Sequence, residues 1–210
     1  MNYIDALITD YPLLDPCRQE ILNAHELLTG CINGGGKIFV CGNGGSAADA
    51  EHIVGELMKG FRLKRKLTPG QIRKIAEIFP EEYEFISQNL QQAIPAISLV
   101  GSVSLATAFA NDVNPDFIFA QQLYGLGNPG DALIAISTSG NSVNVLNAAK
   151  AAKIRGMNII GLTGCDGGLL KNLCTVSIGV PAADVAKIQE LHLPVYHCLC
   201  SMLEQFLFDK

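Results

Sequence analysis

Short apolar runs and longer amphipathic stretches alternate along most of the chain. The apolar runs are rich in Ile and Val and show no strict alternation of apolar and polar residues, which is typical of strands covered on both faces. Such runs occur at 37–41, 93–100, 132–137, 158–162 and 176–180. Their alternation with helical patterns predicts an α/β fold: one doubly wound domain with a five-stranded parallel sheet flanked by helices.

The stretches between these runs predict the helices that connect the strands. Helical periodicity is found at 47–60, 105–110, 117–123 and 143–155, and in a short segment at 168–173. The first 34 residues carry Leu and Ile at a spacing of about 3.6 residues, which predicts an N-terminal helix ended by Gly34-Gly35-Gly36. Residues 185–208 predict a long C-terminal helix with an apolar face.

Residues 63–92 interrupt the alternation between the first connecting helix and the second strand. Thr68-Pro69 marks a helix start, and Pro80 should break or restart that helix. We expect a charged, helical insertion on the surface. No change in composition separates a second domain, so residues 1–210 are expected to form a single domain that carries this insertion.

Composition and charge exclude several classes of protein. The chain has 210 residues, a net charge of −5 and a pI of about 5.3. This charge argues against a nucleic-acid or anionic-membrane binder, which needs a basic face, and the basic run 62–66 is interpreted as a solvated linker. No apolar run reaches the roughly 20 residues of a membrane span, and no basic segment precedes an apolar one as in a signal peptide. Seven cysteines, most of them in apolar runs, indicate reduced thiols in a cytoplasmic protein.

Two turns after predicted strands are rich in glycine and hydroxyl groups. The first is Gly42-Asn43-Gly44-Gly45-Ser46, and the second is Ser137-Thr138-Ser139-Gly140-Asn141-Ser142. Each opens a predicted helix, where free amide N–H groups and the helix dipole favour an anion. A tight turn or a simple N-cap would also explain such residues. Four hydroxyl groups within six residues exceed what a cap requires and indicate a phosphate site.

A histidine and a glutamate follow the first turn on one predicted helix. His52 and Glu56 are four residues apart and therefore share a face. On the C-terminal helix, His192 and His197 are five residues apart, about 140° around the axis, so only one of them should enter a given pocket. Alone, each of these residues is more typical of a solvated or packed side chain. Next to a phosphate site they indicate chemistry on a phosphorylated small molecule.

Taken together, these motifs resemble those of the sugar isomerase (SIS) domain family. Within it, the chain is similar to the isomerases of seven-carbon sugar phosphates, which interconvert sedoheptulose 7-phosphate and D-glycero-D-manno-heptose 7-phosphate. The resemblance covers nearly the whole chain and is interrupted at 63–92. It is carried by 42–50, by His52 and Glu56, by 110–112, by 136–142 and 162–164, and by Ile188-Gln189-Glu190 with His192 and His197.

The resemblance implies roles for individual residues. Glu56 would be the catalytic base and His197 the acid of an aldose–ketose isomerisation through an enediol. The substrate and its phosphate would be held by Asn43, Gly44, Ser46, Asp49, Asp112, Ser137, Thr138, Ser139, Ser142 and Gln189.

The resemblance also implies a metal and an assembly. One zinc ion per subunit would be bound by His52, Glu56, Gln189 and His197. A glutamate bound to zinc is not free to take a proton, so either the two roles alternate, or the metal polarises the carbonyl while another group moves the proton. The family further implies a homotetramer, and the apolar C-terminal run agrees with an interface.

Two other functions stay open at the level of sequence. The chain could be a non-catalytic SIS module that binds a phosphosugar and regulates or bridges a protein partner. The presence of Glu56 argues against this, because the relatives of that kind lack the glutamate. It could also isomerise another sugar phosphate, since Met58-Lys59-Gly60-Phe61 replaces a Gly-Arg-Tyr of many relatives, and Ala186 and Lys187 also depart from their pattern.

Overall fold

A computed structural model describes residues 2–209 and contains one five-stranded parallel sheet. The strands are β1 (Ile38–Cys41), β2 (Ala96–Ser98), β3 (Ala132–Ile136), β4 (Asn158–Thr163) and β5 (Val176–Gly179). Their order across the sheet is β2-β1-β3-β4-β5. The predicted α/β fold is therefore confirmed, and each predicted strand is present, although β2 is shorter than the apolar run at 93–100.

The direction of winding reverses between the neighbouring strands β1 and β3. Ile38 pairs with Ala132 and Cys41 with Ala135. All residues of β1 and β3 are buried, which explains why these strands have continuous apolar sequences. In parallel sheets, ligands bind beyond the carboxyl ends of the strands at such a switch point, and both glycine- and hydroxyl-rich turns lie there.

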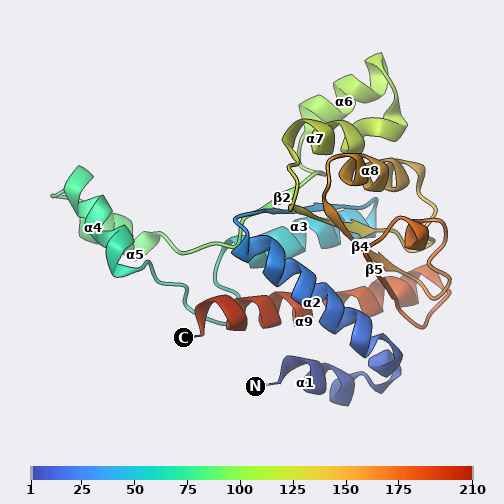
Figure 1. The fold of residues 1–210 in the computed structure, drawn as a ribbon, viewed down its shortest axis with the longest axis horizontal. Coiled ribbons are helices and arrows are strands. Elements are labelled where there is room, and N and C mark those ends of the chain that lie inside the picture. Colours follow the sequence, from blue (N-terminus) through green and yellow to red (C-terminus); the bar gives the residue numbers. More distant parts are fainter. Residues whose placement is uncertain (1, 210) are drawn as a thin grey trace.

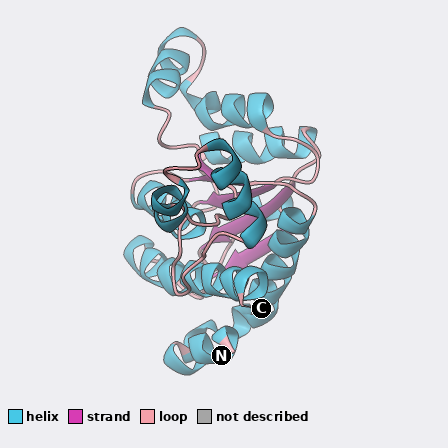
Figure 2. Ribbon diagram, turned by 90° about the vertical axis from the view of Figure 1, so that its left-hand side faces the viewer, coloured by secondary structure: helices cyan, strands magenta, loops and turns pink. Residues whose placement is uncertain are grey.

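Helices cover both faces of the sheet (Figure 2). One face packs against α1 (Tyr3–Asp10), α2 (Arg18–Asn33), α3 (Gly45–Met58) and α9 (Val185–Phe208), and the other against α7 (Ile118–Leu126) and α8 (Val143–Ile154). Successive side chains of β1 alternate between the two cores: Ile38 and Val40 join the first, and Phe39 and Cys41 the second. Short 3₁₀ helices occur at Pro12–Cys17, Pro115–Phe117 and Leu170–Asn172.

The predicted terminal helices are confirmed with one difference. The N-terminal helical region is divided near Tyr11-Pro12, so that α1 and α2 are separate and α2 ends at Asn33, just before the three glycines. The long C-terminal helix has the predicted limits and includes Pro194. Helix α6 (Val103–Asp112) lies beside α7, on the side of the molecule away from α9 (Figure 1).

The insertion forms a helical hairpin that projects from the rest of the molecule (Figure 1). It consists of α4 (Pro69–Ile78) and α5 (Tyr83–Asn89), neither of which has a buried residue. Thr68 and Gln71 form a reciprocal capping box at the start of α4, and Pro80 lies between the two helices. The predicted helix start and restart are both confirmed.

The two ends of this hairpin lie side by side. The main-chain N–H of Gln92 donates to the carbonyl of Arg65 (2.8 Å), and its side-chain amide donates to the carbonyl of Lys66 (2.7 Å). Between residues 2 and 209, no helix is long and apolar enough to cross a membrane. The seven cysteines are unpaired, and five of them are buried.

Candidate functional site

The turn from β1 to α3 is shaped by glycines. A Cβ on Gly42 would lie 2.5 Å from the carbonyl oxygen of Ser46, and Gly44 has a φ of +57°, which other residues rarely adopt. Ser46 is the second residue of α3 and is 3 % exposed. The backbone thus brings amide groups and one hydroxyl to the N-terminus of a 14-residue helix, a favourable place for an anion.

The turn from β3 to α8 has the same character. Gly140 has a φ of +65°, and a Cβ there would lie 2.1 Å from the carbonyl oxygen of Gly167. The Ser137 and Ser142 hydroxyl oxygens are 3.1 Å apart, and Ser139 is exposed. Since β1 and β3 are adjacent, this turn lies next to the first one.

A pair of asparagines joins the two turns. Asn43 and Asn144 donate their amides to each other reciprocally, at 2.8 and 2.9 Å. The side chain predicted to contact a sugar hydroxyl is therefore engaged with the first turn of α8. The sequence did not predict a role for Asn144, because only the pairing of β1 with β3 places it opposite Asn43.

Three of the predicted site residues meet where α3 and α9 face each other. The carboxylate Oε1 of Glu56 lies 3.1 Å from His52 Nε2 and 3.2 Å from His197 Nε2. Glu56 is only 5 % exposed, whereas about half of the His52 side chain is accessible. His192 faces the other way: it is fully buried and its Nε2 lies 3.1 Å from the carbonyl oxygen of Thr163. The prediction that only one of the two α9 histidines enters the site is confirmed.

Burial favours the neutral forms of Glu56 and His197, which means opposite shifts in their pKa values. It raises the pKa of Glu56 above its usual value, an effect that the nearby His52 partly offsets. Burial and, to a smaller extent, the nearby His52 and Arg62 lower the pKa of His197. A carboxylate with a raised pKa and a neutral imidazole are suited to exchanging protons with a substrate near neutral pH.

The same three side chains fit a metal ion. One donor atom from each of His52, Glu56 and His197 lies within 4.8 Å of the others. Glu56 Oε2 and His197 Nε2 are buried and form no hydrogen bond with the described residues, so these polar atoms lack a partner that a cation would supply. Two imidazoles and a carboxylate are common ligands of catalytic zinc.

The fourth predicted ligand is not in this cluster. Both polar atoms of the Gln189 amide lie within 3 Å of the position that a Cβ on Gly45 would occupy. Gly45 precedes Glu56 by 11 residues in α3, a rise of about 16 Å. Within one chain the structure therefore groups three of the four predicted ligands and places Gln189 beside Gly45, at the N-terminus of α3.

The two predicted aspartates lie in different places. Asp49 lies on α3 near the cluster and accepts a hydrogen bond from the Tyr196 hydroxyl (3.3 Å). Asp112 is exposed at the end of α6 and accepts a hydrogen bond from its neighbour Asn111. Helix α6 is on the far side of the sheet from α9 (Figure 1), so this chain alone does not bring Asp112 to the site.

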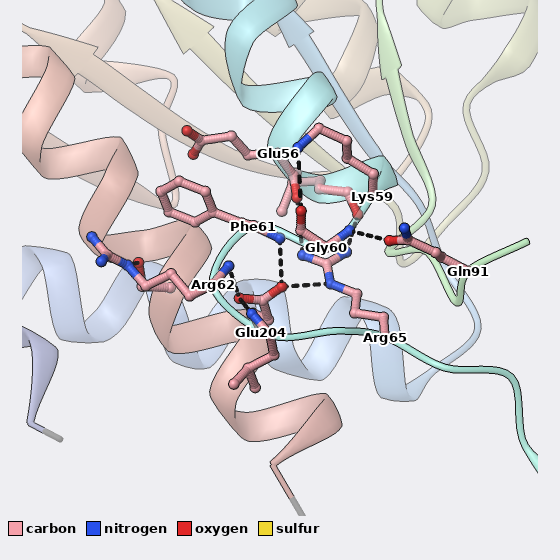
Figure 3. Close-up of polar contacts among 11 residues, drawn as sticks. Glu56, Lys59, Gly60, Phe61, Arg62, Arg65, Gln91 and Glu204 are labelled. Atoms are coloured by element: carbon pink, nitrogen blue, oxygen red, sulfur yellow. Dashed lines mark hydrogen bonds and ion pairs between the residues drawn. The ribbon is translucent and has the colours of Figure 1, made fainter. Parts of the chain in front are cut away.

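A buried ion pair supports the end of α3 that carries Glu56 (Figure 3). Arg65 is 1 % exposed; its guanidinium donates to the carbonyls of Glu56 (2.9 Å) and Leu57 and pairs with Glu204 of α9 at 2.8 Å. Glu204 also accepts the main-chain N–H groups of residues 61, 62 and 63. The network ties the C-terminus of α3 to α9, and both helices carry residues of the cluster.

The sequence had indicated 62–66 as a solvated linker, and this interpretation is wrong for Arg65. A run of basic residues at the start of a charged insertion resembles a surface segment. Only the position of Glu204, 139 residues further along the chain, reveals that one of the five is buried.

Comparisons with known proteins agree with this geometry. The SIS domain pattern matches residues 13–77 and 76–164, two segments that meet within the insertion. A phosphoheptose isomerase of Shewanella baltica is 39 % identical over 212 aligned residues, covering all of this chain and 94 % of that protein.

Two solved structures are similar over nearly the full length. The phosphoheptose isomerase of Francisella tularensis has a TM-score of 0.77 and 32 % identity, covering 97 % of this chain and 95 % of that one. That of Neisseria gonorrhoeae has a TM-score of 0.71 and 32 % identity, with coverage of 96 % and 98 %. The five-stranded parallel sheet with two glycine- and hydroxyl-rich turns at its switch point agrees with the fold of the sugar isomerase domains. The chain belongs to the SIS domain family and, within it, to the family of the phosphoheptose isomerases.

Proposed function

We propose that this protein is an aldose–ketose isomerase that converts sedoheptulose 7-phosphate to D-glycero-D-manno-heptose 7-phosphate. The observation that carries the proposal is the meeting of Glu56 and His197 on facing helices, with Oε1 and Nε2 3.2 Å apart. The names of the most similar relatives support the choice of a seven-carbon sugar.

The phosphate would bind at the two turns at the switch point. Ser46, Ser137, Thr138, Ser139 and Ser142 would hold it with the amide groups at the starts of α3 and α8. Gly44, Asn43, Asp49, Asp112 and Gln189 would contact or orient the sugar chain. The N-terminal ends of two helices supply positive potential without a lysine, which agrees with the absence of any basic residue from either turn.

Isomerisation would proceed by proton transfer through an enediol. Glu56 would remove the proton from the carbon next to the carbonyl and return it to the adjacent carbon. His197, kept neutral by its lowered pKa, would exchange a proton with the oxygen atoms. Burial of Glu56 strengthens it as a base relative to a solvated carboxylate.

A zinc ion would be held by His52, Glu56 and His197, and Gln189 would join them only after moving from Gly45. When bound, such an ion supplies Lewis acidity that polarises the carbonyl. While Glu56 and His197 hold the ion they would not be free to transfer protons, so either their two roles would alternate or another group would move the proton.

We also propose a homotetramer in the cytoplasm, formed by the 210 residues as one SIS domain. Helix α6 supports an assembly because none of its ten residues is buried, although Val103, Leu105 and others are apolar. Asp112 lies on this helix, so a neighbouring copy could supply it to the site. Light scattering coupled to size-exclusion chromatography should give about four times the chain mass of 22.4 kDa, and a monomer active at the same concentration would contradict the assembly.

The function is tested by incubation with sedoheptulose 7-phosphate in heavy water. NMR should show the aldose product with deuterium at the carbon that receives the proton, because the proton taken up by Glu56 can exchange with solvent deuterium before it is returned to the enediol. A second sample treated with a chelator measures how far turnover depends on a metal. Binding of the phosphosugar without conversion in either sample would identify a non-catalytic module instead.

One observation favours a second candidate, the isomerisation of a different sugar phosphate. The segment that replaces Gly-Arg-Tyr borders the site: the ring of Phe61 lies 5.6 Å from that of His197, centroid to centroid. A changed residue at this point alters the space next to the reacting carbons. Pentulose and hexulose phosphates in the same assay distinguish the two, and the substrate with the highest kcat/KM decides.

A further inference from the structure

Tyr196 lies behind the His52–Glu56–His197 cluster and joins two residues of α3. It is 2 % exposed on α9, and its hydroxyl is 2.9 Å from His52 Nδ1 and 3.3 Å from Asp49 Oδ1. Its ring packs edge-on against His52, with centroids 5.5 Å apart. Tyr196 therefore touches His52 through both its ring and its hydroxyl group.

The direction of these hydrogen bonds follows from the chemistry of the three groups. An ionised carboxylate can only accept, so the single hydroxyl proton of Tyr196 goes to Asp49. The hydroxyl oxygen is then free to accept, and its second neighbour is His52 Nδ1. His52 therefore donates from Nδ1, and the neutral form of its ring has the lone pair on Nε2.

This assignment explains the contacts at the other side of the ring. His52 Nε2 faces Glu56 Oε1 at 3.1 Å, and His197 Nε2 faces the same oxygen at 3.2 Å. His197 Nε2 forms no hydrogen bond with any of residues 2–209. Neutral imidazole is a common metal ligand, and a metal ion between Nε2 and the carboxylate makes this arrangement favourable; the alternative is a second proton on Nε2, which pairs His52 directly with Glu56.

We propose that Tyr196 is a positioning residue that, together with Asp49, fixes the Nδ1–H tautomer of His52 and directs Nε2 toward Glu56 for metal binding. The part of this proposal that concerns zinc binding rests on the proposed metal site, whereas the part that concerns the tautomer of His52 does not. Ligating histidines generally donate their second ring N–H to an oxygen, and removing that partner typically weakens metal binding 10–100-fold.

A purely structural role predicts something different. A buried tyrosine needs a hydrogen-bond partner, and Asp49 alone would satisfy that need. Loss of the hydroxyl would then lower stability without changing the state of His52 or the affinity for a metal. The two roles are therefore separated by measurements on His52, not by stability.

The test compares the Tyr196→Phe variant with the wild-type protein, both as full-length chains. This change removes one oxygen and keeps the ring, and Tyr124→Phe, an exposed position on α7, is the matched control. Zn²⁺ affinity is measured by competition with a chromophoric chelator. Nitrogen-15 NMR of histidine-labelled, metal-free protein reports the tautomer of each ring, and His52→Gln assigns the His52 signals.

We expect Tyr196→Phe to bind Zn²⁺ about 10–100-fold more weakly and to show a mixture of His52 tautomers, with no change in Tyr124→Phe. The wild-type spectrum, recorded at a pH where the His52 ring is neutral, is decisive by itself if the variant does not fold: a neutral ring with its proton on Nε2 overturns the proposal. Unchanged zinc affinity and an unchanged tautomer in Tyr196→Phe overturn it as well. If the wild type has no isomerase activity, the proposed function fails, but the tautomer measurement still decides the role of Tyr196.

Discussion

At the scale of single residues, helical spacing predicted which side chains share a face. His52 and Glu56 lie on one face of α3, and only one of the two histidines of α9 joins them, as the angle between His192 and His197 predicted. The spacing could not predict Tyr196. Its contact with His52 spans 144 positions in the chain and depends on how two helices pack, not on the sequence around either of them.

The role of Glu56 as base is tested by Glu56→Gln. Turnover should fall about 10³-fold, the typical contribution of a general base, whereas affinity for the phosphosugar should change little because the turns are untouched. Isothermal titration and the heavy-water assay measure the two effects. Glu51→Gln, an exposed position on the same helix, is the control. Wild-type turnover in Glu56→Gln would assign proton transfer to another group.

The raised pKa of Glu56 also predicts a pH profile. A base must be ionised to act, and burial favours its protonated form. As the pH falls, kcat/KM should therefore decline at a higher pH than it would for an ordinary glutamate. A profile that stays flat down to the usual range of glutamate would contradict this environment.

The phosphate site is tested by Ser139→Ala with Ser142→Ala. Hydrogen bonds to a charged group contribute about 1.5–3 kcal/mol each, so KM for the phosphorylated sugar should rise by about 100-fold or more. The free sugar should be affected far less. Steady-state kinetics with both forms gives the ratio, and Ser87→Ala in the insertion is the control. Equal effects on both sugars would place the phosphate elsewhere.

At the scale of elements, the segment that leads from α3 into the insertion is held by one carboxylate. Glu204 accepts three consecutive main-chain N–H groups and the Arg65 guanidinium. Although burial alone would raise the pKa of Glu204, these donors lower it overall. Helical periodicity predicted both limits of α9 correctly. It could not predict this network, because a glutamate near a helix end, such as Glu204, is usually solvated.

Glu204→Gln should destabilise the protein by about 3 kcal/mol at neutral pH, because it leaves the buried Arg65 without a counter-charge. The folded-state pKa of Glu204 is lowered, so its contribution is fully present above the unfolded value of about 4.3. It is lost as the pH falls through the folded value. The difference in the free energy of unfolding between the variant and the wild type, measured by chemical denaturation, should therefore become smaller below about pH 4. A constant difference would show that the charge of Glu204 is not the cause.

At the scale of the whole molecule, the insertion is attached to the domain without being part of its core. Neither α4 nor α5 contains a buried residue, and the main chain on the two sides of the hairpin is joined by hydrogen bonds between Gln92 and residues 65 and 66. The family pattern also matches in two segments that meet inside it.

Replacement of 67–90 by two glycines should therefore preserve the fold. Arg65, Gln91 and Gln92 are retained, so the contacts at the base remain, and the free energy of unfolding should change by less than about 1 kcal/mol. Denaturation and the isomerase assay measure the outcome, and the charge-preserving variant Arg65→Lys, which disturbs the base instead of the hairpin, is the contrasting case. A large loss of stability on deletion would show that the hairpin packs against the domain or a neighbouring copy.

The sequence by itself determined the order of strands and helices, the two glycine- and hydroxyl-rich turns, the limits of α9 and the shared face of His52 and Glu56. These properties depend on interactions between residues that are close in the sequence and on the fixed period of a helix or strand. The parallel packing of α3 against α9 was decided only by the tertiary structure, and with it the grouping of His197 with Glu56, the Asp49–Tyr196–His52 contacts and the burial of Arg65. The separation of Gln189 from the cluster and of Asp112 from the site has the same origin. Contacts between side chains more than 100 positions apart depend on how helices and strands pack around a common core, and a local sequence pattern does not predict this packing.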